Sequence, residues 1–278
     1  MIDLPAVSFQ ENWLEVLNAD FMRKAFMAGV VTAVASGAIG YFVILRQQAF
    51  ASHALAHIGF PGATAAILIG IPITLGMVTF TVVGAIAMAL AGNRLNDRDI
   101  ATGTILAFAT GLGLFFSNIA STAAANVTNV LFGNLVAVTT SQLISFAVFL
   151  CLILLIIAVC YRPLLFTSIS PEVAQARGLN TGRLNLVFLV TLALTITMAV
   201  QTVGVLLVFA LIVTPPATAL LLTARPLPAL FLSIAIGTLA VIGGLVVSTM
   251  FNLPATFFIV SITTLLWIIA TIARPQNA

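Results

Sequence analysis

Long uncharged stretches recur through this chain and decide what it can fold into. From Phe21 to the C-terminus, apolar runs of about 18 residues or more follow one another, and each can cross a membrane as a helix. The runs are continuously apolar and do not alternate, which favours helices over the strands of a barrel. Because only 6% of the residues are charged, they cannot cover a water-facing surface. The sequence therefore predicts an all-α membrane protein, a polytopic helical bundle.

Nine candidate spans follow from this pattern, and they form a single transmembrane domain over residues 21–278. Residues 1–20 are predicted to form an amphipathic segment at the membrane surface. The stretch 119–140 is too short and too polar to count as a span, so we expect a re-entrant or interfacial piece whose backbone is covered by protein. The prediction is therefore about eight or nine transmembrane helices. The candidate spans are residues 21–45, 50–70, 72–92, 100–118, 141–161, 184–203, 205–223, 228–250 and 254–273.

The basic residues give the orientation. When nine spans alternate, eight of the ten Lys and Arg residues fall on one side, and cytoplasmic loops are rich in these residues. We therefore predict that this side is cytoplasmic and that the acidic N-terminal segment lies outside. If residues 1–20 stay inside instead, Arg23 and Lys24 join the majority and one span has been miscounted. The eight residues are Arg46, Arg94, Arg98, Arg162, Arg177, Arg183, Arg225 and Arg274.

The longest predicted cytoplasmic connection covers about residues 162–183 and carries the only Glu beyond the N-terminal segment. Ser170 has the character of an N-cap, Pro171 of a first helical residue and Glu172 of an acidic first turn, while Gly178 marks a stop. This pattern predicts a short helix with a polar face. It is either an ordinary loop helix or a docking surface for a cytoplasmic partner.

Two adjacent prolines, Pro215 and Pro216, fall in the middle of an apolar span. Proline removes backbone donors and kinks a helix, which neighbouring helices can tolerate in a bundle. The pair is therefore either a structural kink or a flexing point in a transport pathway.

Two histidines are the only ionisable side chains of functional type inside a predicted span. His53 and His57 are four residues apart, so both imidazoles lie on one face of a helix. Two neutral imidazoles at this spacing can share one transition-metal ion. Ionisable residues near mid-membrane are costly and tend to mark substrate or proton paths. The alternative is that the two rings only pack or hydrogen-bond between helices.

The residues that are missing exclude several functions. No GxxxxGK[ST] motif is present, so the chain does not bind ATP by a Walker site. No HExxH motif is present either, and we expect no catalysis and no permanently bound cofactor. Every carboxylate lies outside the predicted spans, whereas a proton-coupled secondary transporter usually embeds one. The basic residues are scattered singly, which gives no indication of nucleic-acid binding.

Five motifs in a fixed order resemble one family of transport proteins. The chain resembles the manganese, zinc and iron permease family of ABC importers, over nearly its whole length from about Phe21. Each motif alone is weak, but their order and spacing together are specific. The motifs are GYFVILR (40–46), ASHALAHIGFPG (51–62), LFGNLVAVT (131–139), ISPEVAQARGL (169–179) and TPPATA (214–219).

This resemblance implies a fold and a set of partners. The expected fold is that of a type II ABC importer permease, working as a homodimer in the bacterial cell membrane. Two ATP-binding cassette subunits would lie below it, and an extracytoplasmic metal-binding protein or lipoprotein would deliver the cargo. The implied function is the membrane subunit of an ATP-driven importer of divalent transition metals. Zinc and manganese are the first candidates for the cargo, and iron is a further one.

The resemblance also assigns residues. Family members commonly carry GDxxxH after the first span, with the Asp and His implicated in metal passage; His57 matches that His, and His53 stands in place of the Asp. Two nitrogen ligands favour zinc over the harder manganese ion, as a hypothesis. Three further positions, Glu172, Ala174 and Gly178, match the cytoplasmic segment that couples the permease to the ATPase.

Three rival functions remain at this point. The same architecture could carry a chelated metal or a vitamin, in which case the histidines matter little. A stand-alone secondary transporter would work without an ATPase. A membrane scaffold would transport nothing, and its histidines would only pack.

Overall fold

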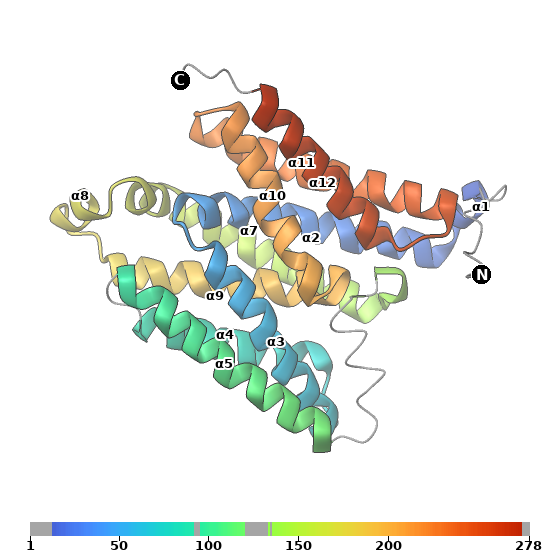
Figure 1. Ribbon diagram of the computed structural model, residues 1–278, viewed down its shortest axis with the longest axis horizontal. Helices are drawn as coiled ribbons and strands as arrows, with labels where there is room; N and C mark the ends of the chain where they lie inside the picture. Colours follow the sequence, from blue (N-terminus) through green and yellow to red (C-terminus); the bar gives the residue numbers. More distant parts are fainter. Residues whose placement is uncertain (1–12, 92–94, 120–132, 134, 274–278) are drawn as a thin grey trace, which may run out of the picture.

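The computed structural model describes residues 13–91, 95–119, 133 and 135–273, and within these ranges it is a bundle of helices without strands (Figure 1). Three short elements are α1 (Trp13–Asn18), the 3-10 turn η1 (Leu135–Ala137) and α8 (Pro171–Ala176). The long helices are α2 (Asp20–Leu45), α3 (Ala49–Ile69), α4 (Ile73–Ala91), α5 (Leu95–Ile119), α7 (Thr140–Ile169), α9 (Thr181–Val203), α10 (Val205–Leu222), α11 (Pro226–Phe251) and α12 (Ala255–Ala273).

Each predicted span corresponds to one of these long helices. Within the described ranges, eight helices are long and apolar enough to cross a membrane, and the apolar part of α10, Val208–Leu222, is shorter. The prediction of about eight or nine transmembrane helices is confirmed.

Helix α7 runs further than its apolar run predicted. It continues to Ile169, past Arg162, with Pro163 inside it. Packing explains the extension, because Leu164 and Thr167 beyond the proline are buried against the bundle. The connection predicted over residues 162–183 therefore shortens to the segment around α8.

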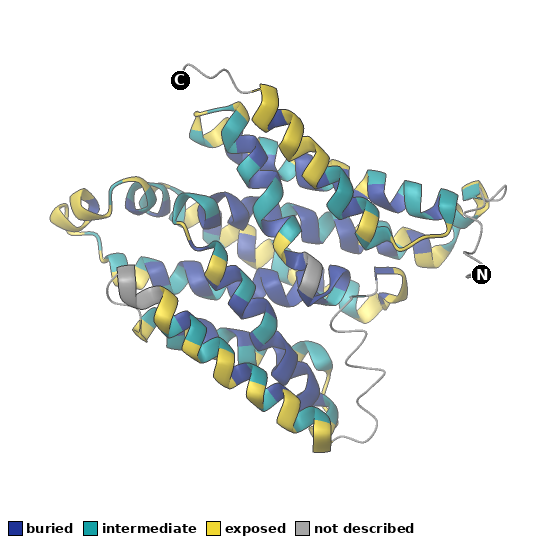
Figure 2. Ribbon diagram, viewed as in Figure 1, coloured by how far each residue is buried: buried dark blue, intermediate teal, exposed yellow. Residues whose placement is uncertain are grey.

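The helices form an inner and an outer set (Figure 2). In the apolar 18-residue segment of each helix, 72% to 78% is buried in α2, α3 and α9. The corresponding share is 17% in α5, α7 and α12. The outer helices expose large apolar residues such as Val159 and Ile272. Exposed residues of this kind suit a lipid environment and not water.

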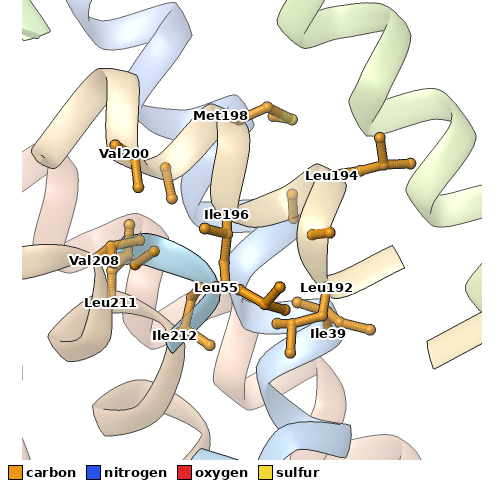
Figure 3. Close-up of a cluster of buried hydrophobic side chains, with 14 of the residues drawn as sticks. Ile39, Leu55, Leu192, Leu194, Ile196, Met198, Val200, Val208, Leu211 and Ile212 are labelled. Carbon is orange, nitrogen blue, oxygen red and sulfur yellow. The ribbon is translucent and has the colours of Figure 1, made fainter. Parts of the chain in front are cut away.

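The inner helices meet around one residue of α3. Leu55 is fully buried and lies among Ile39 of α2, Ile196 of α9 and Ile212 of α10 (Figure 3). This cluster fixes the rotation of α3, because turning the helix would take Leu55 out of its contacts.

The turns between helices gather at two ends of the bundle. The α2–α3 turn (Arg46–Gln48) and α8 lie toward one end, and α1 lies at the opposite end, where it contacts α2 and α11 (Figure 1). Of the predicted N-terminal surface segment, residues 1–12 lie outside the described residues.

Most of the stretch 119–140, predicted as a re-entrant or interfacial piece, also lies outside the described residues. Two described positions in it are covered by protein. Leu135 is 3% exposed, and a Cβ on Gly133 would collide with the backbone of the α9–α10 junction.

Helices α3 and α4 cross at two glycines. A Cβ on Gly62 would collide with the carbonyl oxygen of Gly76, and a Cβ on Gly76 would collide with that of Gly62. The two backbones therefore touch, which only glycine permits. This contact holds α3 against α4.

We expect the substitution Gly62→Ala to destabilise the protein by about 2 kcal/mol, because backbone atoms cannot move aside for the added methyl group. Gly111→Ala in α5 is the matched control, since nothing lies within 4 Å of a Cβ there. Thermal unfolding in detergent should show a lower midpoint for Gly62→Ala only. Equal midpoints for the two variants would contradict the close crossing.

Candidate metal-binding site on helix α3

The turn before α3 sets the direction of the helix. The backbone N–H of Gln48 donates to the backbone carbonyl of Val43 at 3.0 Å. The backbone carbonyl of Gln48 accepts from the backbone N–H of Ser52 at 3.2 Å. Gln47 has a left-handed backbone with φ of 55°. One residue thus closes α2 and opens α3, so the start of α3 is fixed relative to the end of α2.

The two histidines lie together as their spacing predicts. The ring centroids of His53 and His57 are 4.7 Å apart, with an angle of 70° between the ring planes. Both side chains are half-buried. His53 also meets Phe209 of α10 edge to face, at 5.9 Å. The imidazoles are close enough for both to bind one ion after a rotamer change.

The pair lies deep in the bundle. His57 is the ninth residue of a 21-residue helix, which places it about 12 Å from the start of α3 at 1.5 Å per residue. Leu55 and His53 are separated by about 200° around the helix. The core cluster on one side of α3 therefore directs the imidazoles to the other side, toward Phe209.

A proline one turn beyond His57 changes the local chemistry. Pro61 lies inside α3 and has no N–H to donate to the carbonyl of His57. This carbonyl oxygen therefore lacks its α-helical donor.

The chain alone offers an incomplete coordination shell. In the part of the chain that the structure describes, no group of three or more His, Cys, Asp and Glu side chains lies close enough to hold a metal ion. Zinc in a closed structural site has four protein ligands. Two imidazoles suit an ion that is bound and then released.

The two prolines of α10 lie against its neighbours. A Cβ on Gly40 of α2 would collide with the Ile212 carbonyl, which is the carbonyl that Pro216 leaves without a helical donor. Pro215 lies close to Gly237 of α11. The prolines thus lie where α10 passes between α2 and α11, on the helix that also carries Phe209.

The predicted coupling residues do not share one exposed surface. Glu172 and Gly178 are exposed, but Ala174 is fully buried, and α8 packs on α7 and α9 of its own chain. Gly178 ends the helix as predicted, with φ of 81°. Ser170 is the N-cap, but its side chain makes no capping hydrogen bond. Ala174 therefore holds α8 to the bundle.

Three polar residues that were not predicted to matter make hydrogen bonds near α8. Gln48 bonds to Asn185, and Thr167 bonds to Arg46. All three lie near the end of an apolar run, on the side predicted to be cytoplasmic. Such positions are a weak signal, because most polar residues at helix ends face water.

Comparison with known proteins decides the family. The model of the ABC 3 transport family matches residues 18–274. The chain belongs to the ABC 3 transport family. The resemblance seen in the sequence is therefore confirmed, and the family extends over all nine long helices. With its many apolar helices, this ABC 3 chain is a multi-pass protein of the bacterial plasma membrane.

Relatives within the ABC 3 family include transporters of two metals. The chain is 30% identical to the manganese transport system membrane protein MntC of Listeria innocua, over 92% of each chain. It is 27% identical to the high-affinity zinc uptake system membrane protein ZnuB of Haemophilus influenzae, over 92% of this chain and 99% of that one. PsaBC from Streptococcus pneumoniae, solved in complex with a Fab, matches with a TM-score of 0.85 and 28% identity over 96% of each chain.

The purified protein should bind zinc through the two imidazoles. We expect His53→Ala and His57→Ala each to weaken zinc binding by about tenfold or more, because removing even a neighbour of a metal ligand costs that much. Isothermal titration in detergent measures the Kd. Cys151→Ser, on the exposed face of α7, is the control that should leave the Kd unchanged. Unaltered binding by both histidine variants would show that the pair is not a ligand set.

Proposed function

We propose that this chain is the transmembrane permease subunit of an ATP-driven importer of divalent transition metal ions, zinc or manganese. His53 and His57 bind the ion on its way across the membrane. The observation that carries the proposal is the close pair of imidazoles, 4.7 Å apart, held deep in an inner helix of an ABC 3 protein. Relatives named for manganese and for zinc support the same cargo class.

A second copy of the chain completes the site. The imidazoles are half-buried, and His53 packs against Phe209, which is itself exposed. Two copies that meet along this face bring four imidazoles together, which is the number of ligands zinc prefers. A homodimer also fits the most common symmetry of oligomers, in which one patch meets its own copy.

The energy and the cargo come from separate subunits. The chain has no Walker motif, so ATP-binding cassette subunits dock at the end of the bundle that holds α8, where Glu172 and Gly178 are exposed. An extracytoplasmic metal-binding protein or lipoprotein docks at the opposite end. The prolines Pro215 and Pro216 give α10 a point at which it flexes beside the ion.

Uptake of radioactive metal tests this function. The protein is expressed with its ATPase and metal-binding partners in cells that lack their own importers. We expect His57→Ala to reduce uptake by about tenfold or more at equal protein level in the membrane. In contrast, His53→Asp replaces a nitrogen ligand by a harder oxygen ligand, so it should keep transport and raise the ratio of manganese to zinc taken up.

The control for uptake is Cys151→Ser, which lies on the exposed face of α7. Normal uptake by His53→Ala and His57→Ala would contradict the proposal. The pathway would then be one for a chelated cargo that does not use the imidazoles.

A further inference from the structure

The α2–α3 turn is bound to the chain on both sides of α8. The guanidinium Nη1 of Arg46 donates to Thr167 Oγ1 at 3.3 Å, and Gln48 Nε2 donates to Asn185 Oδ1 at 3.1 Å. Thr167 lies in the last turn of α7, just before α8. Asn185 lies near the start of α9, just after α8. The two ends of the connection that carries α8 are therefore fastened to one short turn.

The bond between Gln48 and Asn185 is shielded from water, and the bond between Arg46 and Thr167 is partly shielded. The exposed fractions are 8% for Gln48, 5% for Asn185 and 4% for Thr167. A hydrogen bond is stronger in such surroundings, and breaking it leaves a buried polar group without a partner. Arg46 also lies over the ring of Phe188 of α9, 4.9 Å from its centroid. A displacement of α8 with its flanking residues thus pulls on the turn.

The turn leads directly into the helix of the histidines. The Gln48 carbonyl accepts the first hydrogen bond of α3, from Ser52, and His53 is the next residue. A helix rises about 1.5 Å per residue, so about 7.5 Å of continuous helix separates Gln48 from His53. A shift of Gln48 therefore moves the N-terminal end of α3 and, with it, the imidazoles of His53 and His57.

Space beside the turn allows such a shift. A cavity of about 190 Å³ is lined by residues that include Gln48, Asn185, Asp99 and Thr102. Gln48 Oε1 is buried there and has no hydrogen-bond partner among the described residues. The Gln48 side chain is thus held through its amide nitrogen, while its amide oxygen makes no hydrogen bond within the described residues. Close-packed elements without such a void have little room to move.

We propose that the α2–α3 turn transmits movement of α8 to the histidine pair, with Gln48 and Asn185 as its positioning residues. This inference rests on the proposed function, in which α8 receives the movement of the ATPase. Closure of the ATPase shifts α8, the two bonds carry the shift to the turn, and α3 changes the position of the imidazoles.

The test compares ion transport with ATP use in one sample. The complete transporter is reconstituted in liposomes, and zinc uptake and ATP hydrolysis are measured together. Gln48→Leu keeps about the same side-chain volume and removes the side-chain amide. We expect the number of zinc ions transported per ATP hydrolysed to fall about fivefold or more, while ATP hydrolysis continues. The exchanged pair Gln48→Asn with Asn185→Gln can re-form the bond and should restore the ratio.

A matched control lies at the other end of α9, the helix that carries Asn185. Gln201 of α9 also makes an interhelical amide bond, accepting from Thr74 of α4 at 2.9 Å, but it is far from α8. Gln201→Leu should leave the ratio of zinc to ATP unchanged. Thr167→Val breaks the second bond with little change of shape and should lower the ratio as Gln48→Leu does.

A second measurement does not depend on the cargo. In a protein that carries Cys151→Ser and Cys160→Ser, the variant His53→Cys is labelled with a small thiol reagent, with and without ATP. We expect ATP to change the labelling rate, and Gln48→Leu and Thr167→Val each to abolish that change. If ATP still changes the rate in these variants, the inference is overturned. If ATP changes the labelling rate but the protein with both histidines intact takes up neither zinc nor manganese, the proposed function fails and the inference stands.

Discussion

The close packing of α3 is the constraint on which the rest of the structure depends. Its core residue Leu55 lies among three other helices, and its glycine Gly62 touches the backbone of α4. Between them, these contacts leave one face of α3 for polar groups. Two imidazoles in a hydrocarbon environment are costly, and a helix that was free to rotate would turn them toward water or lipid in no fixed direction. Packing of apolar residues therefore determines where the polar residues point.

The sequence predicted the helices well, because lipid leaves a backbone few choices. Every N–H and C=O in the hydrocarbon must be paired within the protein, so a long apolar run is a helix. The spacing of His53 and His57 predicted their shared face for the same reason, since it depends only on the geometry of one helix. The stop after α8 at Gly178 also followed from local chemistry, because glycine tolerates the left-handed backbone that this position adopts.

Features that depend on contacts between residues far apart in the sequence could not be predicted from it. Helix α7 continues past Arg162 because the bundle buries its last turns, which no apolar run indicates. Ala174 faces its own chain and not a partner, and its neighbours belong to α7 and α9. Gln48 and Asn185 are 137 residues apart, so no local pattern could pair them. In each case the deciding contact joins separate helices.

Helix α10 and the α2–α3 turn connect the histidine pair to the prolines and to the residues beside α8. Helix α10 carries both Phe209, which meets His53, and the prolines at which it passes between α2 and α11. The α2–α3 turn joins α3 to the residues on either side of α8. The imidazoles thus lie between a helix with two internal prolines and a turn that is bound to the residues on either side of α8. In the proposed mechanism, small shifts in either one change the space around the ion.

X-ray absorption spectroscopy at the zinc edge identifies the atoms that bind the ion. The protein is loaded with zinc in a membrane-like environment, and the scattering of the nearest atoms is compared with that of His53→Ala. We expect imidazole nitrogens about 2.0–2.1 Å from the ion, with the imidazole signal reduced in the variant. A spectrum that contains only oxygen or sulfur neighbours, or one that the substitution leaves unchanged, would contradict a metal site at the histidine pair.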